Sequence, residues 1–173
     1  MISGILIAAA VTIMMAMLYS ASKGKANENE QGQLLLQLPK FYWILGAFMI
    51  IVGIALLIAA MFHFDSNEDK VVVLCMSLVT LGFGYLLFGK GYISNIVISE
   101  NEIIETSMFR KKTHINFNEI DNITFGKISL ELSIKSKQKK IKAHIHLVGF
   151  RELVAKLSEK TGRTSIEMGI PIQ

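Results

Sequence analysis

Cysteine, proline and tryptophan are scarce in this chain of 173 residues, which has one Cys, two Pro and one Trp. The single cysteine, Cys75, has no partner in the chain, which excludes an internal disulfide framework and a zinc site built on several thiolates. Charge is missing from long stretches, since residues 1–22, 41–64 and 71–89 contain no Asp, Glu, Lys or Arg. These three stretches decide how the first 90 residues are interpreted.

Each uncharged stretch is long enough to cross a bilayer as a helix. At about 1.5 Å per residue the central one covers about 36 Å, against a hydrocarbon core of about 30 Å. Aromatic side chains stand at both of its ends, which is typical of headgroup depth. The sequence therefore predicts a membrane region over residues 1–90, with three transmembrane helices at about 2–22, 41–64 and 71–89.

Lysine and arginine are distributed unevenly between the loops. Signal peptides carry positive charge before their apolar run, but here Lys23 and Lys25 follow it, so the first stretch is expected to be a retained span. The loop at 65–70 has one lysine against three acidic residues, whereas fourteen of the 18 Lys and Arg residues follow residue 89. The positive-inside rule then predicts a multi-pass protein of the cell (plasma) membrane, with its N-terminus outside and its C-terminal domain cytoplasmic.

Within the first cytoplasmic loop, residues 33–38 form an apolar segment that ends before Pro39. This segment suits the lipid surface, and it equally suits packing on a soluble domain. The sequence does not decide between these two placements.

From residue 92 the apolar pattern changes from a helical period to a period of two, which is typical of antiparallel strands. About six short strands are expected, at residues 94–99, 102–106, 113–117, 122–125, 129–135 and 139–147. An amphipathic helix follows, because Phe150, Leu153, Val154 and Leu157 recur at helical spacing before Gly162. Residues 163–173 are expected to form a polar tail.

The hairpin NIVISENEIIETSMFRKK, followed by INFNEIDNITF, two strands and the helix GFRELVAKLSEK, resembles the bacterial pleckstrin-homology-like (PH-like) domain found behind transmembrane segments. Within INFNEIDNI the resemblance implies buried positions at Phe117, Ile120 and Ile123. It also implies a small β domain over residues 91–162 that binds proteins or lipids and catalyses nothing. The six expected strands are one fewer than the seven of the full PH pattern. The expected fold is thus a three-helix membrane anchor followed by a small, mainly-β PH-like domain with one C-terminal amphipathic helix.

The sequence contains few residue patterns that are typical of catalysis or metal binding. His114, His144 and His146 are the candidates for a metal site, but no cysteine accompanies them and lysines flank two of them. The spans lack the charged side chains that line transport pathways. We therefore expect no enzyme activity, no catalytic residues, no metal site and no cofactor.

A basic hairpin at residues 135–146 is the candidate binding surface. Its members are Lys135, Lys137, Lys139, Lys140, Lys142, His144 and His146. Two functions stay open: a cytoplasmic scaffold that binds a protein partner or its own copies, and recognition of anionic lipid headgroups by the basic hairpin. A solvated edge that only prevents strand aggregation is the third possibility. Nucleic acid is not expected, since the basic strand has no aromatic side chains for base stacking.

Overall fold

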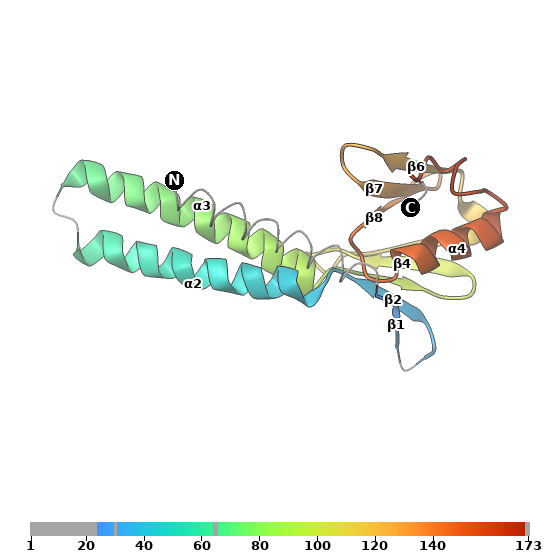
Figure 1. Cartoon of the computed structure of the whole chain (residues 1–173), viewed down its shortest axis with the longest axis horizontal. Coiled ribbons are helices and arrows are strands. Elements are labelled where there is room, and N and C mark those ends of the chain that lie inside the picture. The colour runs from blue at the N-terminus through green and yellow to red at the C-terminus, as the bar shows by residue number, and fades with distance from the viewer. Residues whose placement is uncertain (1–23, 30, 64–65, 172–173) are drawn as a thin grey trace, which may run out of the picture. The chain divides into compact units, whose positions relative to one another are not determined.

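The computed structural model describes residues 24–29, 31–63 and 66–171, and the chain forms two units (Figure 1). The helical unit contains residues 40–94. The β unit combines residues from both sides of it, 24–39 and 95–171 in the part of the chain that is described. The first predicted span, at about 2–22, lies outside the described residues.

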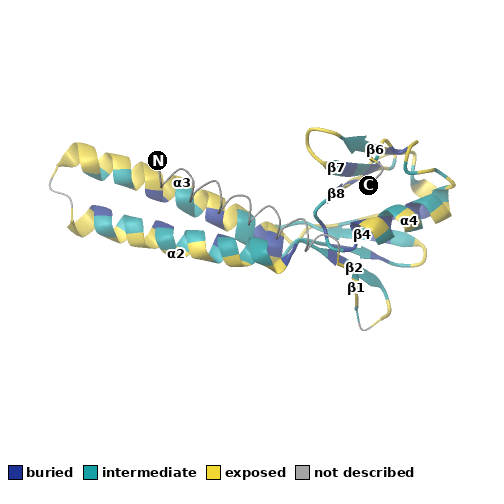
Figure 2. Ribbon diagram, in the orientation of Figure 1, coloured by how far each residue is buried: buried dark blue, intermediate teal, exposed yellow. Residues whose placement is uncertain are grey.

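The helical unit contains the other two predicted spans, and both are confirmed as helices. Helix α2 is Lys40–Phe62 and helix α3 is Asn67–Tyr92, and each is long and apolar enough to cross a membrane. Helix α3 begins before the apolar stretch, because Glu68 and Asp69 in its first turn suit the positive end of a helix dipole. Much of both helices is exposed (Figure 2), and the exposed residues include large apolar ones such as Phe48, Val71 and Phe83, as a lipid solvent permits.

Small residues let α2 and α3 pack closely against each other. The buried residues are Gly46, Gly53 and Ala60 on α2 and Ser77, Gly84, Gly89 and Gly91 on α3. Three members of each set recur every seven residues, a spacing that keeps one face toward a partner helix. Small side chains allow the close backbone approach that stabilises helix pairs in lipid. The Ser77 hydroxyl adds a hydrogen bond, which it donates to the Gly53 carbonyl at 2.7 Å.

The β unit contains two antiparallel sheets and one longer helix. Sheet A has the order β1 (Asn27–Glu28), β2 (Leu34–Gln37), β3 (Asn95–Ile98), β4 (Glu102–Thr106) and β5 (Lys112–Asn116). Sheet B has the order β6 (Asn122–Gly126), β7 (Glu131–Lys135) and β8 (Lys140–His144). A short 3₁₀ helix, η1 (Phe117–Glu119), connects the sheets, and α4 (Phe150–Thr161) follows sheet B. The six expected strands are present as β3 to β8, but β7 begins at Glu131 and not at residue 129, and β8 ends at His144 and not at residue 147.

Strand β2 lies in the apolar segment 33–38, whose placement the sequence did not decide. It pairs antiparallel with β3, with Leu36 opposite Ile96, and the Leu36 side chain is 0% exposed in the core. The segment therefore packs on the β unit, and the predicted domain start at residue 91 leaves out two of its strands, β1 and β2. Two residues, Leu38 and Pro39, separate β2 from α2, so the helical pair is inserted between two paired strands.

The core lies between the two sheets and α4. Its fully buried side chains include Leu36, Ile103, Ile115, Leu132, Ile134, Ile141, Leu153 and Leu157. The predicted helix is confirmed with Phe150, Leu153 and Leu157 buried and Val154 partly buried. It ends at Gly162, whose φ of 68° is the left-handed conformation that suits glycine. Phe117 and Ile123 are buried, as the resemblance implies, whereas Ile120 is only partly buried.

The predicted polar tail is wrong over its described part. Met168 is 1% exposed, and its carbonyl accepts the Phe125 N–H at 3.0 Å. Ile170 also packs on the core. The tail therefore covers the edge strand β6. Its apolar side chains pack on the core, and its carbonyl accepts a backbone N–H of the edge strand.

The β unit is expected to fold without the helices when residues 39–93 are replaced by Asn-Gly. This dipeptide suits a two-residue hairpin turn, and Leu38 and Ser94 would extend the ladder between β2 and β3 by one pair. In that protein Leu36→Ala should lower the free energy of unfolding by about 2–5 kcal/mol, because a fully buried leucine is truncated. Urea denaturation followed by circular dichroism measures the change.

Leu35→Ala is the matched control, because the Leu35 side chain is only partly buried and the substitution should cost much less. Residues 91–173 alone lack β2 and are expected to unfold at lower urea or without cooperativity. A fragment 91–173 that is as stable as the Asn-Gly protein would contradict the assignment of β2 to this unit.

Gly84→Leu should destabilise the helical pair. A Cβ atom on Gly84 would lie 2.9 Å from the backbone nitrogen of Ile50 and 3.0 Å from the carbonyl oxygen of Gly46. Overpacking of this kind costs about 1–3 kcal/mol. Gly82→Leu is the control, since a Cβ there meets nothing within 4 Å. Thermal melts of the full chain in detergent should show a lower Tm for Gly84→Leu only, and an equal loss in both variants would exclude close packing at Gly84.

Candidate functional site

The turn between β7 and β8 brings four of the predicted lysines together. Lys135 lies opposite Lys140 in the ladder, and the Ser136 N–H donates to the Lys139 carbonyl at 2.9 Å to close the turn. Lys135, Lys137, Lys139 and Lys140 are all exposed. These four lysines, the basic turn, form a compact positive surface at one end of sheet B.

Lys142 has a different environment from the basic turn. Its Nζ lies 2.9 Å from Oε2 of Glu131, and the hydrogen bond and charge of that carboxylate raise the pKa of Lys142. Its backbone N–H also donates to the carboxylate of Glu105. Two carboxylates therefore surround Lys142, so it adds less positive potential to the hairpin than sequence alternation suggests.

The two histidines of the predicted surface pack against each other. The alternation predicts both imidazoles on the solvated face, but both residues are partly buried, with ring centroids 5.0 Å apart. The His146 backbone N–H donates to Nδ1 of His144 at 3.2 Å. Burial lowers the pKa of His146, so this side chain is protonated at a lower pH than a solvated histidine. Mild acid therefore adds less charge to this surface than two solvated histidines would.

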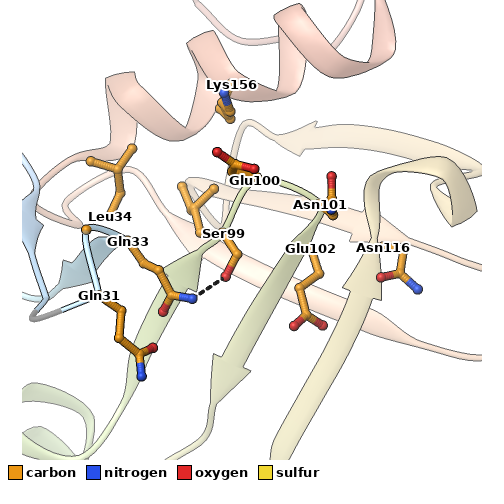
Figure 3. Close-up of a pocket in the computed structure, with 11 residues that line it drawn as sticks. Gln31, Gln33, Leu34, Ser99, Glu100, Asn101, Glu102, Asn116 and Lys156 are labelled. Atoms are coloured by element: carbon orange, nitrogen blue, oxygen red, sulfur yellow. Dashed lines mark hydrogen bonds between the residues drawn. The ribbon is translucent and has the colours of Figure 1, made fainter.

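An open groove of about 680 Å³ lies at another place on the β unit (Figure 3). It is lined by Gln31, Gly32, Gln33, Leu34, Ile98, Ser99, Glu100, Asn101, Glu102, Asn116 and Lys156. These residues come from the β1–β2 turn, the β3–β4 turn, the end of β5 and the helix α4. None of the seven predicted site residues lines the groove.

Hydrogen bonds fix the two turns that form the groove. Nε2 of Gln33 donates to the hydroxyl of Ser99 at 2.8 Å, which joins the two turns at one end of sheet A (Figure 3). The Asn29 side-chain oxygen accepts the backbone N–H groups of Gln31 and Gln33, and this holds the β1–β2 turn. The polar groups of the groove are therefore positioned by the fold before any ligand binds.

The groove offers many hydrogen-bonding groups and an excess of negative charge. Glu100 and Glu102 supply two carboxylates, while Lys156 supplies one ammonium group that also pairs with Glu159 at 3.1 Å. Oε2 of Glu102 lies 3.2 Å from Nδ1 of His114. The remaining polar side chains are amides and a hydroxyl, which both donate and accept hydrogen bonds. Such a set suits the backbone and the cationic side chains of a peptide better than an anionic ligand.

Sequence reasoning missed this groove because its residues are scattered along the chain. They lie in four segments, near residues 31–34, 98–102, 116 and 156, and only the pairing of β2 with β3 brings the first two together. Sequence reasoning also missed Glu105, which sits two residues after the buried Ile103 and therefore on the inner face of β4. The signal available in the sequence was a Glu at a position where strand alternation predicts an inward-facing side chain.

Glu105→Gln is expected to stabilise the β unit at pH 7. Burial raises the pKa of Glu105 above its ordinary value of 4.5, so the folded chain binds this proton more tightly than the unfolded chain. Stability from Glu105 is therefore present at low pH and is lost as the pH rises through the raised pKa. Glutamine keeps an oxygen for the Lys142 N–H without the charge, so the variant should lack this loss.

Thermal melts of the Asn-Gly protein at several pH values between 4.5 and 7 measure the effect. The difference in Tm between Glu105→Gln and the parent should be largest at pH 7 and should shrink toward acid. Glu119→Gln, which changes an exposed carboxylate, is the control. A Glu105→Gln protein that melts below its parent at pH 7 would show that the ionised carboxylate stabilises the fold.

Comparisons of the chain with protein-family models, with curated proteins and with solved structures find no match.

Proposed function

We propose that this protein is a membrane-anchored, non-catalytic interaction module whose groove binds a segment of a protein partner at the cytoplasmic surface. The register of β2 with β3 is the observation that carries this proposal. At one end of this ladder Gln37 lies opposite Asn95, and the chain continues from there into the helices. At the other end Leu34 lies opposite Ile98, and both residues line the groove. The groove therefore lies at the end of this ladder opposite to the strand ends that are joined to the helices.

The strand count supports the resemblance to PH-like domains. Apart from the two-residue β1, which pairs with β2, the unit has seven strands, β2 to β8, followed by the C-terminal helix α4. Strand β2 is the one that the sequence pattern lacked, because it precedes the helical pair. This arrangement supports a PH-like module that carries its membrane anchor as an insertion after its first long strand.

Charge and strand pairing together support a β unit on the cytoplasmic side of the membrane. Residues 24–39 and 95–171 fold into one unit, and two membrane-length helices lie between them in the chain. Both segments must then lie on the same side of the membrane that the helices cross. Since most of the Lys and Arg residues are in these segments, the positive-inside rule favours the cytoplasm for the β unit.

A basic or polar peptide is the ligand class that the groove fits best. A volume of about 680 Å³ is in the range of small-ligand and peptide-anchor pockets. Glu100 and Glu102 would pair with a Lys or Arg side chain, while Gln31, Gln33 and Asn101 would bond to its backbone. The partner is therefore expected to present an extended segment with at least one cationic side chain. A second copy of the chain is included in this class, because its own surface is rich in lysine.

The basic turn lies at the same end of the β unit as the groove, because η1 links the two. Asn122, opposite Lys135, comes shortly after η1, and Phe117 in η1 donates its N–H to the carbonyl of Asn101 at 3.0 Å. A surface at this end is remote from the strand ends that lead into the helices. Lipid recognition by the basic turn is therefore the weaker alternative, and an acidic region of the same protein partner suits it better.

Site-specific photocrosslinking tests the proposed function in the cells that produce the protein. A photoreactive amino acid at Asn101, in the groove, should give a protein adduct of defined mass, and Glu100→Lys with Glu102→Lys should remove the adduct. The same photoreactive amino acid at Asn118, which is exposed and does not line the groove, is the matched control. Equal adducts at both positions, or an adduct that survives the charge reversal, would contradict binding in the groove.

A further inference from the structure

Two loops of the β unit expose large apolar side chains at their tips. Phe109 in the β4–β5 loop is 75% exposed, and Ile128 in the β6–β7 loop is 101% exposed. Hydrogen bonds hold the first loop, because the Arg110 N–H donates to the Ser107 carbonyl at 2.8 Å and the Ser107 N–H donates to the Lys111 carbonyl at 2.9 Å. The aromatic ring is thus presented by a defined turn.

Positive charge accompanies both apolar tips. Arg110, Lys111 and Lys112 follow Phe109 directly, and Lys127 precedes Ile128. All four cationic residues are exposed, and the segments 107–112 and 126–130 contain no acidic residue. Single exposed apolar residues are common on protein surfaces, but an apolar tip beside uncompensated cations is the composition that binds an anionic membrane interface.

The β4–β5 loop extends from the end of sheet A that leads into the helices. Thr106, the last residue before this loop, lies opposite Asn95, and Asn95 lies opposite Gln37. Only Leu38 and Pro39 separate Gln37 from helix α2, and only two residues separate helix α3 from Asn95. A residue extends at most about 3.6 Å, so this end of the sheet has a short covalent link to the anchor.

Hydrogen bonds of the segment that follows β8 link the β6–β7 loop to this same end of sheet A. The Ile145 N–H donates to the Leu130 carbonyl at 2.9 Å, and three residues later the Val148 N–H donates to the Gln37 carbonyl at 2.9 Å. These bonds bring the loop that carries Ile128 toward the same strand end as the loop that carries Phe109.

We propose that these two loop tips form a membrane-docking surface, made of Phe109, Arg110, Lys111, Lys112, Lys127 and Ile128, that lies on an anionic bilayer. Phe109 and Ile128 enter the interfacial layer, and the four cationic side chains contact lipid phosphates. This surface is separate from the basic turn and from the groove. Docking would hold the β unit in one orientation, with the groove directed away from the bilayer. The inference rests on the proposed membrane anchoring but does not require that the groove binds a partner.

Depth-dependent quenching in proteoliposomes tests the docking surface in the full chain. With Cys75→Ser as background, single variants Phe109→Cys and Ile128→Cys are labelled with a polarity-sensitive fluorophore. Vesicles contain about 30 mol% phosphatidylglycerol in phosphatidylcholine, or phosphatidylcholine alone, with a quencher at headgroup depth. Both labels should be quenched about threefold more strongly in anionic than in neutral vesicles, and salt at about 1 M, where the Debye length is about 3 Å, should reverse this.

Two control positions make the result decisive. Ile166→Cys labels an exposed apolar position outside both loops, and Ser136→Cys labels the basic turn. Neither label should respond to anionic lipid, and Lys111→Gln with Lys112→Gln should abolish the response at position 109 while thermal melts stay unchanged. Quenching at Ser136 rather than at the loop tips, or equal quenching at all positions, would overturn the proposal. Photocrosslinking at Asn101 is independent of this result, so failure of docking and failure of the groove are distinguishable.

Discussion

The pairing of β2 with β3 is the constraint on which the rest of the structure depends. These strands lie opposite each other in the ladder, yet both helices of the helical pair lie between them in the sequence. The membrane-length helices therefore occupy the position of a hairpin loop. Because a strand pair cannot form across a bilayer, helices that cross a membrane at this position would leave both flanking segments on one side of it. The pairing also supplies Leu36 to a core that the C-terminal segment alone leaves incomplete.

The same register gives the β unit two ends with different chemistry. One end carries the strand termini that lead to the helices, together with the exposed side chains of Phe109 and Ile128 and their neighbouring cations. The other end carries the polar groove, in which Glu100 and Glu102 outnumber the single cation Lys156. The apolar, cationic loop tips suit a lipid surface, whereas the groove, with its excess of carboxylates, suits a protein ligand.

The sequence predicted those parts of the fold that depend on local pattern. The two described spans follow from uncharged length, and α4 follows from the helical spacing of Phe150, Leu153 and Leu157. Strand β2 was not predictable, because four residues, LLLQ, suit a strand, a buried helix or a lipid surface, and their partner lies beyond both helices. Alternation also predicted the outward lysines of β8, but the ion pair of Lys142 with Glu131 depends on cross-strand register, which one strand alone does not reveal.

Disulfide trapping across β2 and β3 tests the central claim most directly. Leu35 lies opposite Val97, and facing positions in an antiparallel ladder have Cα separations that a disulfide spans. With Cys75→Ser as background, Leu35→Cys and Val97→Cys in native membranes should lose both free thiols on mild oxidation and regain them on reduction. Leu35→Cys with Asn95→Cys, two residues out of register, should stay reduced. Efficient trapping of the out-of-register pair, or free thiols in the matched pair, would contradict the insertion of the helical pair between paired strands.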